Sequence, residues 1–343
     1  MKAINIVKPG QVSIIDRPLP SPKQGEALLK LCYGGICGSD LGSYRGTFAY
    51  VSYPRIPGHE FSAKVVEVNA EDHSLEPGMV VTANPYFNCG HCHACSKALV
   101  NACMDNQTMG VQREGSFSTY ITMPVCRIYD GKGLDAKTLA LIEPFAIAYH
   151  GVKRADPTPD DRVLVIGSGT IGLLAAHAAS LFGARVWVAD IAEGKLELAR
   201  RFGFTNTIIN SGGETFEQAV KEATDGAGFD VVIEAVGLGS TFVQSVEASA
   251  HGARVVQIGV GKEHVPFNFT MIQKKELTLL GSRNATKEDF LTLIDLVRER
   301  GLDLSQMVSR VYPFDQAPLA FEEFSRESGT LLKVLIDFND GAE

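Results

Sequence analysis

Four cysteines stand close together in the segment NPYFNCGHCHACSKALVNAC, residues 84–103. Their spacing is C-x2-C-x2-C-x7-C, and the residues are Cys89, Cys92, Cys95 and Cys103. Thiolates at such short intervals, in a segment with little room for a regular helix or strand, are typical of a closed tetrahedral zinc site with a structural role. Because four thiolates complete the tetrahedron, we expect His91 and His93 to be exposed loop residues and not ligands.

A second set of metal-binding residue types lies earlier in the chain. Cys37 occurs in GICGSD, and His59 and Glu60 are adjacent in PGHEF. A catalytic zinc needs about three protein ligands and one open position for water or substrate. Taken alone, a single cysteine is also typical of a buried core residue, and an adjacent His and Glu are also typical of a polar turn. These residues by themselves are therefore compatible with a metal site and with a purely structural role.

A glycine-rich turn follows an apolar run in VLVIGSGTIG and has the spacing G-x-G-x-x-G. The first glycine permits a tight turn, the second lets a pyrophosphate approach the backbone, and the third lets the helix pack closely on the strand. The helix N-terminus then faces the phosphate charge. We predict a dinucleotide site. Its predicted residues, in this turn and after later strands, are Gly167, Gly169, Thr170, Ile171, Gly172, Asp190, Gly237, Gly259 and Val260.

Asp190 lies 18 residues beyond Gly172, at the end of the next predicted strand. An acid there accepts hydrogen bonds from the adenosine ribose and repels a 2′-phosphate. The next residues, Ile191 and Ala192, supply no arginine, so the sequence favours NAD over NADP. The alternative is an aspartate that only caps a helix.

The elements that position these residues change in type along the chain of 343 residues, which is long enough for two domains. The first 150 residues or so are predicted to form short strands separated by turns, such as QVSIID, EALLKL and KVVEV. From Arg162, apolar strands alternate with helices, which is typical of a parallel, doubly wound sheet. A helix is expected over KEDFLTLIDLVRERG, and LLKVLIDF is expected to be a strand that returns to the first domain.

Composition and charge exclude some classes of protein. The net charge is −8, and no cluster of Lys and Arg suggests nucleic-acid binding. The N-terminus has no leader pattern and no stretch reaches membrane-spanning length, so we expect a cytoplasmic protein with no membrane partner. Seven cysteines do not suit a secreted disulfide framework. The two cysteines outside the motifs, Cys32 and Cys126, are interpreted as core residues.

The motifs GICGSD, GHE, the four-cysteine loop, IEP at 142–144 and GSGTIG follow one another over nearly the whole chain. In this combination the sequence resembles the zinc-containing medium-chain alcohol and polyol dehydrogenases. The resemblance implies an α/β protein with a GroES-like distorted β-barrel catalytic domain (1–152 and 286–343) and a Rossmann domain (153–285), the active site lying in the cleft between them. It also implies a homodimer or homotetramer, associated through strand edges near 255–268.

The resemblance assigns the catalytic zinc to Cys37, His59 and Glu60. Glu143, in the IEP motif, matches a family acid that reaches the metal or its water, and its alternative is a buried, hydrogen-bonded acid. With the cysteine loop this implies two zinc ions per chain. Ser39 matches the hydroxyl residue that begins proton release. Many relatives place a histidine three residues later, but here Gly42 stands there, so a histidine relay is not expected.

In such enzymes zinc acts as a Lewis acid that favours loss of the substrate hydroxyl proton, and hydride passes to the nicotinamide. Glu60 as third ligand and Arg283, in LLGSRNATKEDF, favour a polyhydroxy substrate, although Arg283 could instead form an ion pair at a domain edge. The GSRNAT and IEPFAI segments most resemble sugar-acid dehydrogenases that oxidise L-gulonate or L-galactonate at carbon 5. The alternatives are sorbitol or L-threonine 3-dehydrogenase, or a cofactor-binding structural or regulatory protein.

Overall fold

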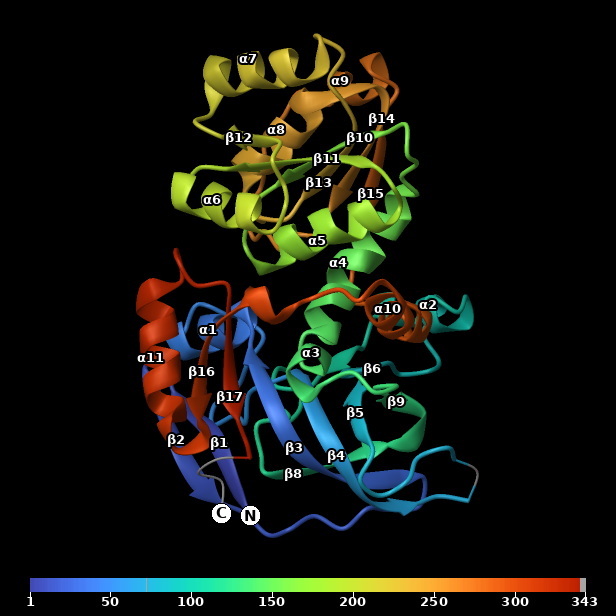
Figure 1. Ribbon diagram of the computed structural model, residues 1–343, viewed down its shortest axis with the longest axis vertical. Coiled ribbons are helices and arrows are strands. Elements are labelled where there is room, and N and C mark those ends of the chain that lie inside the picture. The colour runs from blue at the N-terminus through green and yellow to red at the C-terminus, as the bar shows by residue number, and fades with distance from the viewer. Residues whose placement is uncertain (72, 340–343) are drawn as a thin grey trace. The chain divides into compact units, whose positions relative to one another are not determined.

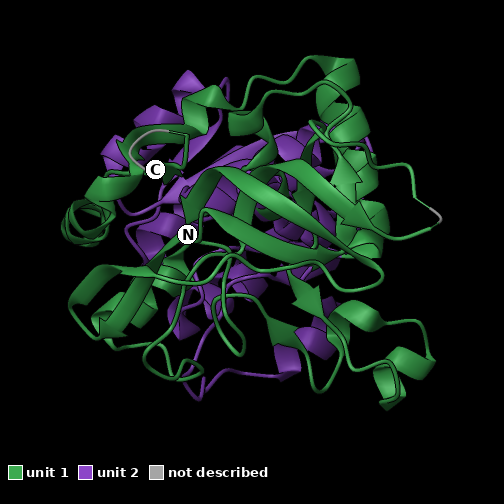
Figure 2. Cartoon of the chain, turned by 90° about the horizontal axis from the view of Figure 1, so that it is seen from below, with its two compact units in different colours: residues 1–143, 286–343 green, residues 144–285 purple. Residues whose placement is uncertain are grey.

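The structure is a computed structural model that describes residues 1–71 and 73–339 (Figure 1). It divides into two compact units (Figure 2). One comprises Met1–Glu143 with Thr286–Glu343, and the other Pro144–Ala285. The second boundary coincides with the one expected from the sequence. The first falls within helix α4 (Ile142–Ala155), and the expected boundary after residue 152 lies in that same helix.

The first unit is built on a seven-stranded sheet in the order β16-β17-β3-β4-β5-β9, with β8 also paired to β3. The sheet strands are β3 (Glu26–Ile36), β4 (Glu60–Asn69), β5 (Val80–Ala83), β8 (Tyr120–Pro124), β9 (Ile128–Asp130), β16 (Val308–Pro313) and β17 (Lys333–Asp337). Two small antiparallel pairs are β1 (Lys2–Lys8) with β2 (Gln11–Asp16), and β6 (Tyr86–Phe87) with β7 (Gln107–Thr108). The helices of this unit are α1 (Gly38–Arg45), α2 (His93–Ser96), α3 (Ala136–Leu139), α10 (Lys287–Arg300) and α11 (Ala317–Glu327).

The pairing of three strands brings distant sequence positions to one place. In the antiparallel pair of β3 and β4, Gly35 lies opposite Glu60. On the other side of β3, Val334 of β17 lies opposite Ile36. The end of β3 and the beginnings of β4 and β17 therefore meet, although they are far apart in the sequence. The strand predicted over LLKVLIDF does return to the first unit.

Helix α10 shows how local sequence sets an element's limits. Thr286 Oγ accepts a hydrogen bond from the backbone amide of Asp289, whose carboxylate accepts one from the amide of Thr286. This reciprocal pair satisfies donors at the helix start. Gly301 ends the helix in the left-handed conformation, with φ of 59°, which glycine adopts at little cost. The helix predicted over this segment is confirmed.

The second unit is a six-stranded parallel sheet in the order β12-β11-β10-β13-β14-β15. Its strands are β10 (Arg162–Ile166), β11 (Arg185–Asp190), β12 (Thr207–Ile209), β13 (Phe229–Glu234), β14 (Ser249–Gln257) and β15 (Thr278–Gly281). Besides α4, its helices are α5 (Thr170–Leu181), α6 (Glu193–Arg201), α7 (Gly213–Thr224), α8 (Gly239–Ala248) and α9 (Thr270–Lys274). This is the Rossmann strand order, and ligands bind where it reverses, at the carboxyl ends of β10 and β13.

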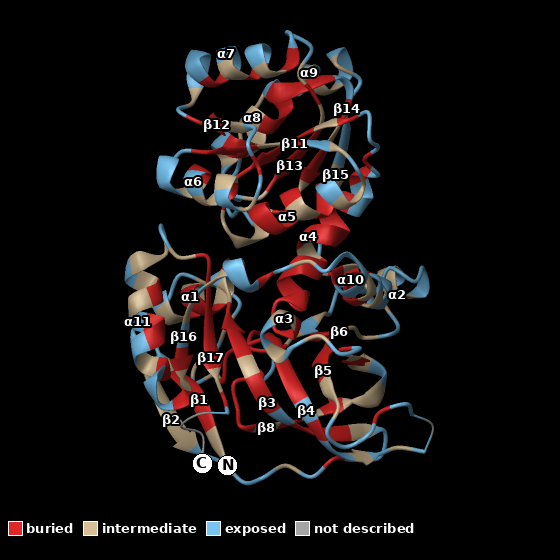
Figure 3. Cartoon of the chain, in the orientation of Figure 1, coloured by how far each residue is buried: buried red, intermediate tan, exposed pale blue. Residues whose placement is uncertain are grey.

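Burial follows from this layered arrangement. The central strands β3, β10 and β13 are mostly buried, whereas the outer faces of the helices are exposed (Figure 3). Strand β14 is paired on both sides, so the edge strand of the sheet on this side is β15, which lies outside residues 255–268. Cys32 is buried as predicted, but the prediction for Cys126 was wrong: its position between β8 and β9, in a short 3-10 turn, exposes it to solvent.

Among residues 1–71 and 73–339, no helix combines the length and the apolar character needed to cross a membrane.

Close backbone approach near the GHE motif generates a prediction for stability. An ideal Cβ at Gly115 would lie 2.1 Å from the carbonyl oxygen of Pro57 and 2.7 Å from that of Gly58. Backbone atoms cannot move aside easily, so we expect Gly115→Ala to lower the free energy of unfolding by roughly 1–3 kcal/mol. At Gly329 an added Cβ would meet no atom within 4 Å, which makes Gly329→Ala the matched control. Thermal unfolding compares the two, and equal melting temperatures would contradict the prediction.

Candidate active site

The second set of predicted metal ligands comes together at the meeting point of β3, β4 and β17. Cys37 follows β3, His59 precedes β4, and Glu60 is the first residue of β4. One ligand atom from each of the three lies within 4.8 Å of the others. His59 and Glu60 are buried and Cys37 is partly exposed, so solvent reaches the group mainly at Cys37. Sulfur, nitrogen and oxygen donors arranged in this way suit zinc with an open coordination position.

Asp40, in the first turn of α1, joins the two segments that carry these residues. Its carboxylate accepts a hydrogen bond from the backbone amide of Cys37 at 3.0 Å and one from that of Gly58 at 3.1 Å. Burial raises the pKa of Asp40, although the charge of His59 opposes the rise. Asp40 thus fixes the separation between the Cys37 turn and the GHE segment.

Lys333 forms a buried ion pair with Glu60. Its Nζ lies 2.8 Å from Oε1 and 2.6 Å from Oε2 of Glu60, and both side chains are nearly inaccessible to solvent. Burial lowers the pKa of Lys333, but the charges of Glu60, Cys37 and Glu143 and the hydrogen bond to Glu60 together outweigh that effect, and the pKa is raised. A carboxylate oxygen has two lone pairs, so Glu60 can hold Lys333 and still bind a metal.

Glu143 lies near the same group, in the first turn of α4, and is buried. The hydroxyl of Tyr86, from β6, donates a hydrogen bond to its Oε1. Burial raises the pKa of Glu143 to about 7, while the charge of His59 acts in the opposite direction. The pKa of Tyr86 is raised well above its usual value by burial and by Glu143. Tyr86 therefore orients one oxygen of Glu143.

The surroundings of His59 test whether a metal fits here. Its Nδ1 is buried and has no hydrogen-bond partner among the described residues. Burial opposes a charged imidazole, but the neighbouring Cys37 and Asp40 outweigh it and raise the pKa of His59 well above its usual value. The site thus attracts positive charge. A divalent cation held by Cys37, His59 and Glu60 would supply that charge.

Ser39 lies two residues after Cys37, in the first turn of α1, and is partly exposed. Its predicted role in proton release remains a prediction. The place of the absent histidine is occupied by another side chain: an ideal Cβ on Gly42 would lie 3.2 Å from the Cβ of Phe48. The loop after α1 therefore fills the space beside residue 42.

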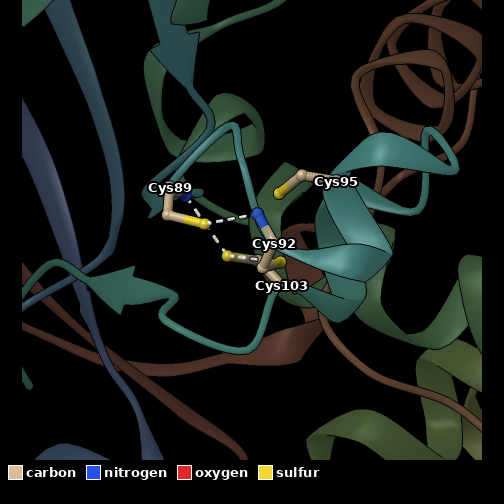
Figure 4. A group of neighbouring side chains, drawn as sticks. All are labelled: Cys89, Cys92, Cys95 and Cys103. Carbon is tan, nitrogen blue, oxygen red and sulfur yellow. Dashed lines mark hydrogen bonds between the residues drawn. The ribbon is translucent and has the colours of Figure 1, made fainter.

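The four cysteines of the other predicted site converge as well, with their sulfur atoms directed toward one region (Figure 4). One Sγ atom from each lies within 4.8 Å of the others. The Sγ atoms of Cys92 and Cys103 are 3.9 Å apart, too far for a disulfide, and the cysteines are free. The loop contains only short elements, α2 and a 3-10 turn at Val100–Ala102.

Backbone amides stabilise negative charge in this loop. The amide of Cys89 donates to Cys103 Sγ at 3.2 Å, and that of Cys92 donates to Cys89 Sγ at 3.4 Å. Hydrogen bonds from the amides of Cys95 and Met104 lower the pKa of the Cys92 thiol to about 6. A group of sulfurs with stabilised thiolates fits a tetrahedral zinc site. The two neighbouring histidines, His91 and His93, are exposed, as expected.

The second unit has a cavity of about 440 Å³ where the strand order reverses. Gly167, Gly169 and Asp190 line it. At Gly172 an added Cβ would lie 1.7 Å from the carbonyl oxygen of Gly167, so only glycine fits this helix start. The Asp190 carboxylate accepts hydrogen bonds from Ser168 N at 2.8 Å and Ser168 Oγ at 2.9 Å, which fixes its position beside the turn.

The other predicted coenzyme residues lie nearby in the same unit. Thr170 and Ile171 begin helix α5. A second cavity, of about 690 Å³, lies at the ends of β13, β14 and β15. The predicted residues that line it are Gly237, Gly259, Val260 and Arg283.

Four residues of these sites were missed from the sequence. They are Asp40, Tyr86, Lys195 and Lys333. Lys195 lines the cavity beside Asp190. Lys333 had a usable signal, since a lysine inside the apolar run LLKVLIDF needs a buried partner. Asp40 had a weaker one, as an acid at the third position of a helix. Tyr86 had none, because its partner Glu143 is remote in the sequence.

Comparisons with known proteins agree with this arrangement. Residues 23–130 match the alcohol dehydrogenase GroES-like domain, and residues 170–299 match the zinc-binding dehydrogenase domain. L-galactonate-5-dehydrogenase of Escherichia coli K12 is 34% identical over 98% of this chain and 100% of its own length. Sorbitol dehydrogenase of Halalkalibacterium halodurans is 29% identical over 95% of this chain and 96% of its own.

Among solved structures, one from Escherichia coli CFT073, described as a short chain alcohol dehydrogenase (rspB) complexed with NADH, is 31% identical. Its TM-score is 0.91, with 98% of this chain and 99% of that chain covered. The chain belongs to the family of zinc-type medium-chain alcohol and polyol dehydrogenases. Its two units are the GroES-like domain and the Rossmann-type domain that define this family.

The two cysteine-containing groups predict separable metal sites. We expect two zinc ions per chain, with Cys37→Ser losing one and Cys95→Ser losing the other, because the ligand sets share no residue. Inductively coupled plasma mass spectrometry on the folded proteins counts the metal. Cys126→Ser, at an exposed thiol outside both groups, is the control and should retain both ions. One zinc in the unmodified protein, unchanged by Cys37→Ser, would contradict the assignment of Cys37.

The buried ion pair generates a stability prediction. Lys333→Met leaves Glu60 buried without its partner, and we expect the free energy of unfolding to fall by about 3–5 kcal/mol. The control is Lys132→Met: Lys132 pairs with Asp295 at the same 2.6 Å, but those side chains are 34% and 38% exposed, against 4% and 1% for Lys333 and Glu60. An exposed pair contributes about 1 kcal/mol or less. Urea unfolding measures both, and similar losses would show that Lys333 does not compensate a buried charge.

Proposed function

We propose that this protein oxidises a secondary hydroxyl of a polyol or sugar acid to a ketone with NAD, using one catalytic and one structural zinc ion. L-gulonate or L-galactonate, oxidised at carbon 5, is the substrate we favour. The observation that carries the proposal is the buried group of Cys37, His59 and Glu60, in which Nδ1 of His59 lacks a partner among the described residues. A zinc site with a purely structural role would have four protein ligands and no open coordination position.

In this reaction the carbinol C–H bond breaks and its electron pair leaves with the hydrogen as hydride, which reduces NAD to NADH. The hydroxyl proton passes to solvent, and the carbon–oxygen bond becomes a carbonyl. Zinc held by Cys37, His59 and Glu60 would supply Lewis-acid polarisation of the reacting oxygen. The protein's own side chains would position the zinc ligands and transfer the proton.

Three side chains hold the proposed ligands in place. Asp40 fixes the Cys37 turn against the GHE segment through two backbone amides. Lys333 balances the charge of Glu60. Tyr86 directs Glu143, whose raised pKa of about 7 suits a group that accepts or returns a proton near neutral pH. Because Phe48 fills the space beside Gly42, we propose that Ser39 passes the proton outward without a histidine at residue 42.

NAD is favoured over NADP by the position of Asp190. Its carboxylate lines the first cavity and repels a 2′-phosphate. Lys195 lines the same cavity, together with Asp190, whose carboxylate is held by Ser168. The NADH complex of the related structure supports the same assignment.

Arg283 is our candidate for substrate recognition. It is exposed at the second cavity, which the ends of β14 and β15 also line. A guanidinium forms two parallel hydrogen bonds with a carboxylate, which suits an aldonate better than a neutral polyol. Similarity to L-galactonate-5-dehydrogenase over the full chain supports a sugar acid. Sorbitol and L-threonine remain the alternatives, in keeping with relatives named for these substrates.

The proposal predicts a substrate order that a kinetic panel can measure. With NAD and NADP in parallel, we expect L-gulonate or L-galactonate to be oxidised with higher kcat/KM than sorbitol or L-threonine, and NAD to be preferred. Arg283→Gln should raise KM for the aldonate roughly ten- to hundredfold by removing a charge-assisted contact, and should change KM for sorbitol little. Arg201→Gln, on the exposed face of α6, is the control. Turnover of sorbitol alone would contradict the sugar-acid assignment, and turnover of no substrate with either coenzyme would contradict the function.

A further inference from the structure

A fully buried carboxylate, Glu234, ends the central strand β13 of the second unit. It is not one of the predicted coenzyme residues. No basic side chain pairs with it among the salt bridges of the described residues. Its charge is instead balanced by neutral donors, which is how a carboxylate fixes the backbone around it.

One oxygen of Glu234 holds the turn that follows β13. Oε1 accepts hydrogen bonds from the backbone amides of Val236 and Gly237, each at 2.9 Å, and from the hydroxyl of Thr241 at 2.6 Å. These contacts fix both ends of the segment 235–241, which connects β13 to the first turn of α8. We call residues 235–239 the ridge.

The other oxygen reaches the neighbouring strand. Oε2 accepts a hydrogen bond from Nε2 of Gln257, at the end of β14, and Nε2 also donates to the carbonyl of Gly259 at 2.8 Å. Only the amide nitrogen of Gln257 can donate to a carboxylate, and as a result its Oε1 is buried without a partner among the described residues. An unpaired buried acceptor is unfavourable. The orientation of Gln257 is therefore set by Glu234.

The ridge and the loop after β14 are in direct backbone contact. An ideal Cβ on Gly259 would lie 2.2 Å from the amide nitrogen of Gly237 and 2.4 Å from Oε2 of Glu234. Gly237 has φ of 86°, in the region that favours glycine. Both glycines are required by the close approach, and Glu234 lies at the point of contact.

The ridge is a shared wall of the two cavities. Ala235 and Val236 line the first, Gly237 and Gly239 line the second, and Leu238 lines both. A ligand with two halves that occupies both cavities must cross this wall. A shift of the ridge should therefore change the affinity of such a ligand. The same shift should have less effect on the affinity of a ligand that occupies the first cavity alone.

We propose that Glu234 is a positioning residue for the coenzyme: by fixing the ridge to the end of β14 it sets the shape of the second cavity, which takes the nicotinamide half. The inference rests on the proposed function, because it requires that the dinucleotide binds here. Glu234 does not touch the coenzyme. It acts through Gly237, Gly259 and Gln257.

Calorimetric titration of the full-length protein with NADH and with AMP tests this inference. AMP contains only the half that the Gly167 turn and Asp190 receive. Glu234→Met removes every acceptor while keeping the side chain's size, and should weaken NADH binding roughly tenfold or more, with AMP affinity changed less than about twofold. Glu234→Gln should lose less NADH affinity than Glu234→Met, since its oxygen still serves the ridge, while its amide cannot accept from Nε2 of Gln257. Glu217→Gln, on the exposed face of α7, is the control.

Gln257→Met keeps the proposal testable if Glu234→Met does not fold. It leaves the ridge contacts and the backbone hydrogen bonds from Ile258 and Gly259 to the Glu234 carbonyl intact and removes the side-chain link to Glu234, so NADH binding should weaken while AMP binding does not. NADH affinity that is unchanged by these substitutions would overturn the inference alone. A parallel loss of AMP and NADH affinity would also overturn it, because Glu234 would then support the whole domain. If the unmodified protein binds no NADH, the proposed function fails and the inference fails with it.

Discussion

The structure of the first unit depends on the burial of several ionisable groups at one point in an apolar sheet. Asp40, His59, Glu60, Glu143 and Lys333 are all almost inaccessible to solvent. Removing a charge from water costs several kcal/mol unless a partner compensates it. The acids outnumber the fixed cation Lys333. Burial raises the pKa of Glu143; burial opposes a charged His59, but the charges of Cys37 and Asp40 outweigh it and raise the pKa of His59. A divalent cation held by Cys37, His59 and Glu60 would compensate this negative charge.

The strand register brings these ionisable residues together, and local hydrogen bonds fix their positions. The pairing of β3 with β4 places Glu60 opposite Gly35, where an added Cβ would lie 2.4 Å from the Glu60 carboxylate. The pairing of β17 with β3 brings Lys333 to the same end of the sheet. The second unit uses close backbone approach in a comparable way, at Gly172 and at Gly237 with Gly259. In both units, glycines make room for the chemistry and buried carboxylates hold the backbone around it.

Much of this could be predicted from the sequence, since it depends on local spacing. The four-cysteine loop, the glycine turn with Asp190 at the end of β11, and helix α10 with its caps each lie within a short segment. Cys37, His59 and Glu60 were grouped through family resemblance, and the strand register explains why they meet. What the sequence did not predict is non-local. Tyr86 bonds to Glu143 and Lys333 to Glu60 only because remote strands are neighbours. Cys126 was misplaced because a 3-10 turn after β8 turns it outward.

The most direct test of the central claim, that the buried group at Cys37 binds a catalytic zinc, is a crystal structure with anomalous diffraction measured on both sides of the zinc absorption edge. The account predicts two peaks per chain that vanish below the edge. One should lie among Cys89, Cys92, Cys95 and Cys103, and the other among Cys37, His59 and Glu60, with Lys333 still bonded to Glu60. A single peak at the four cysteines, in protein that is active as purified, would contradict it.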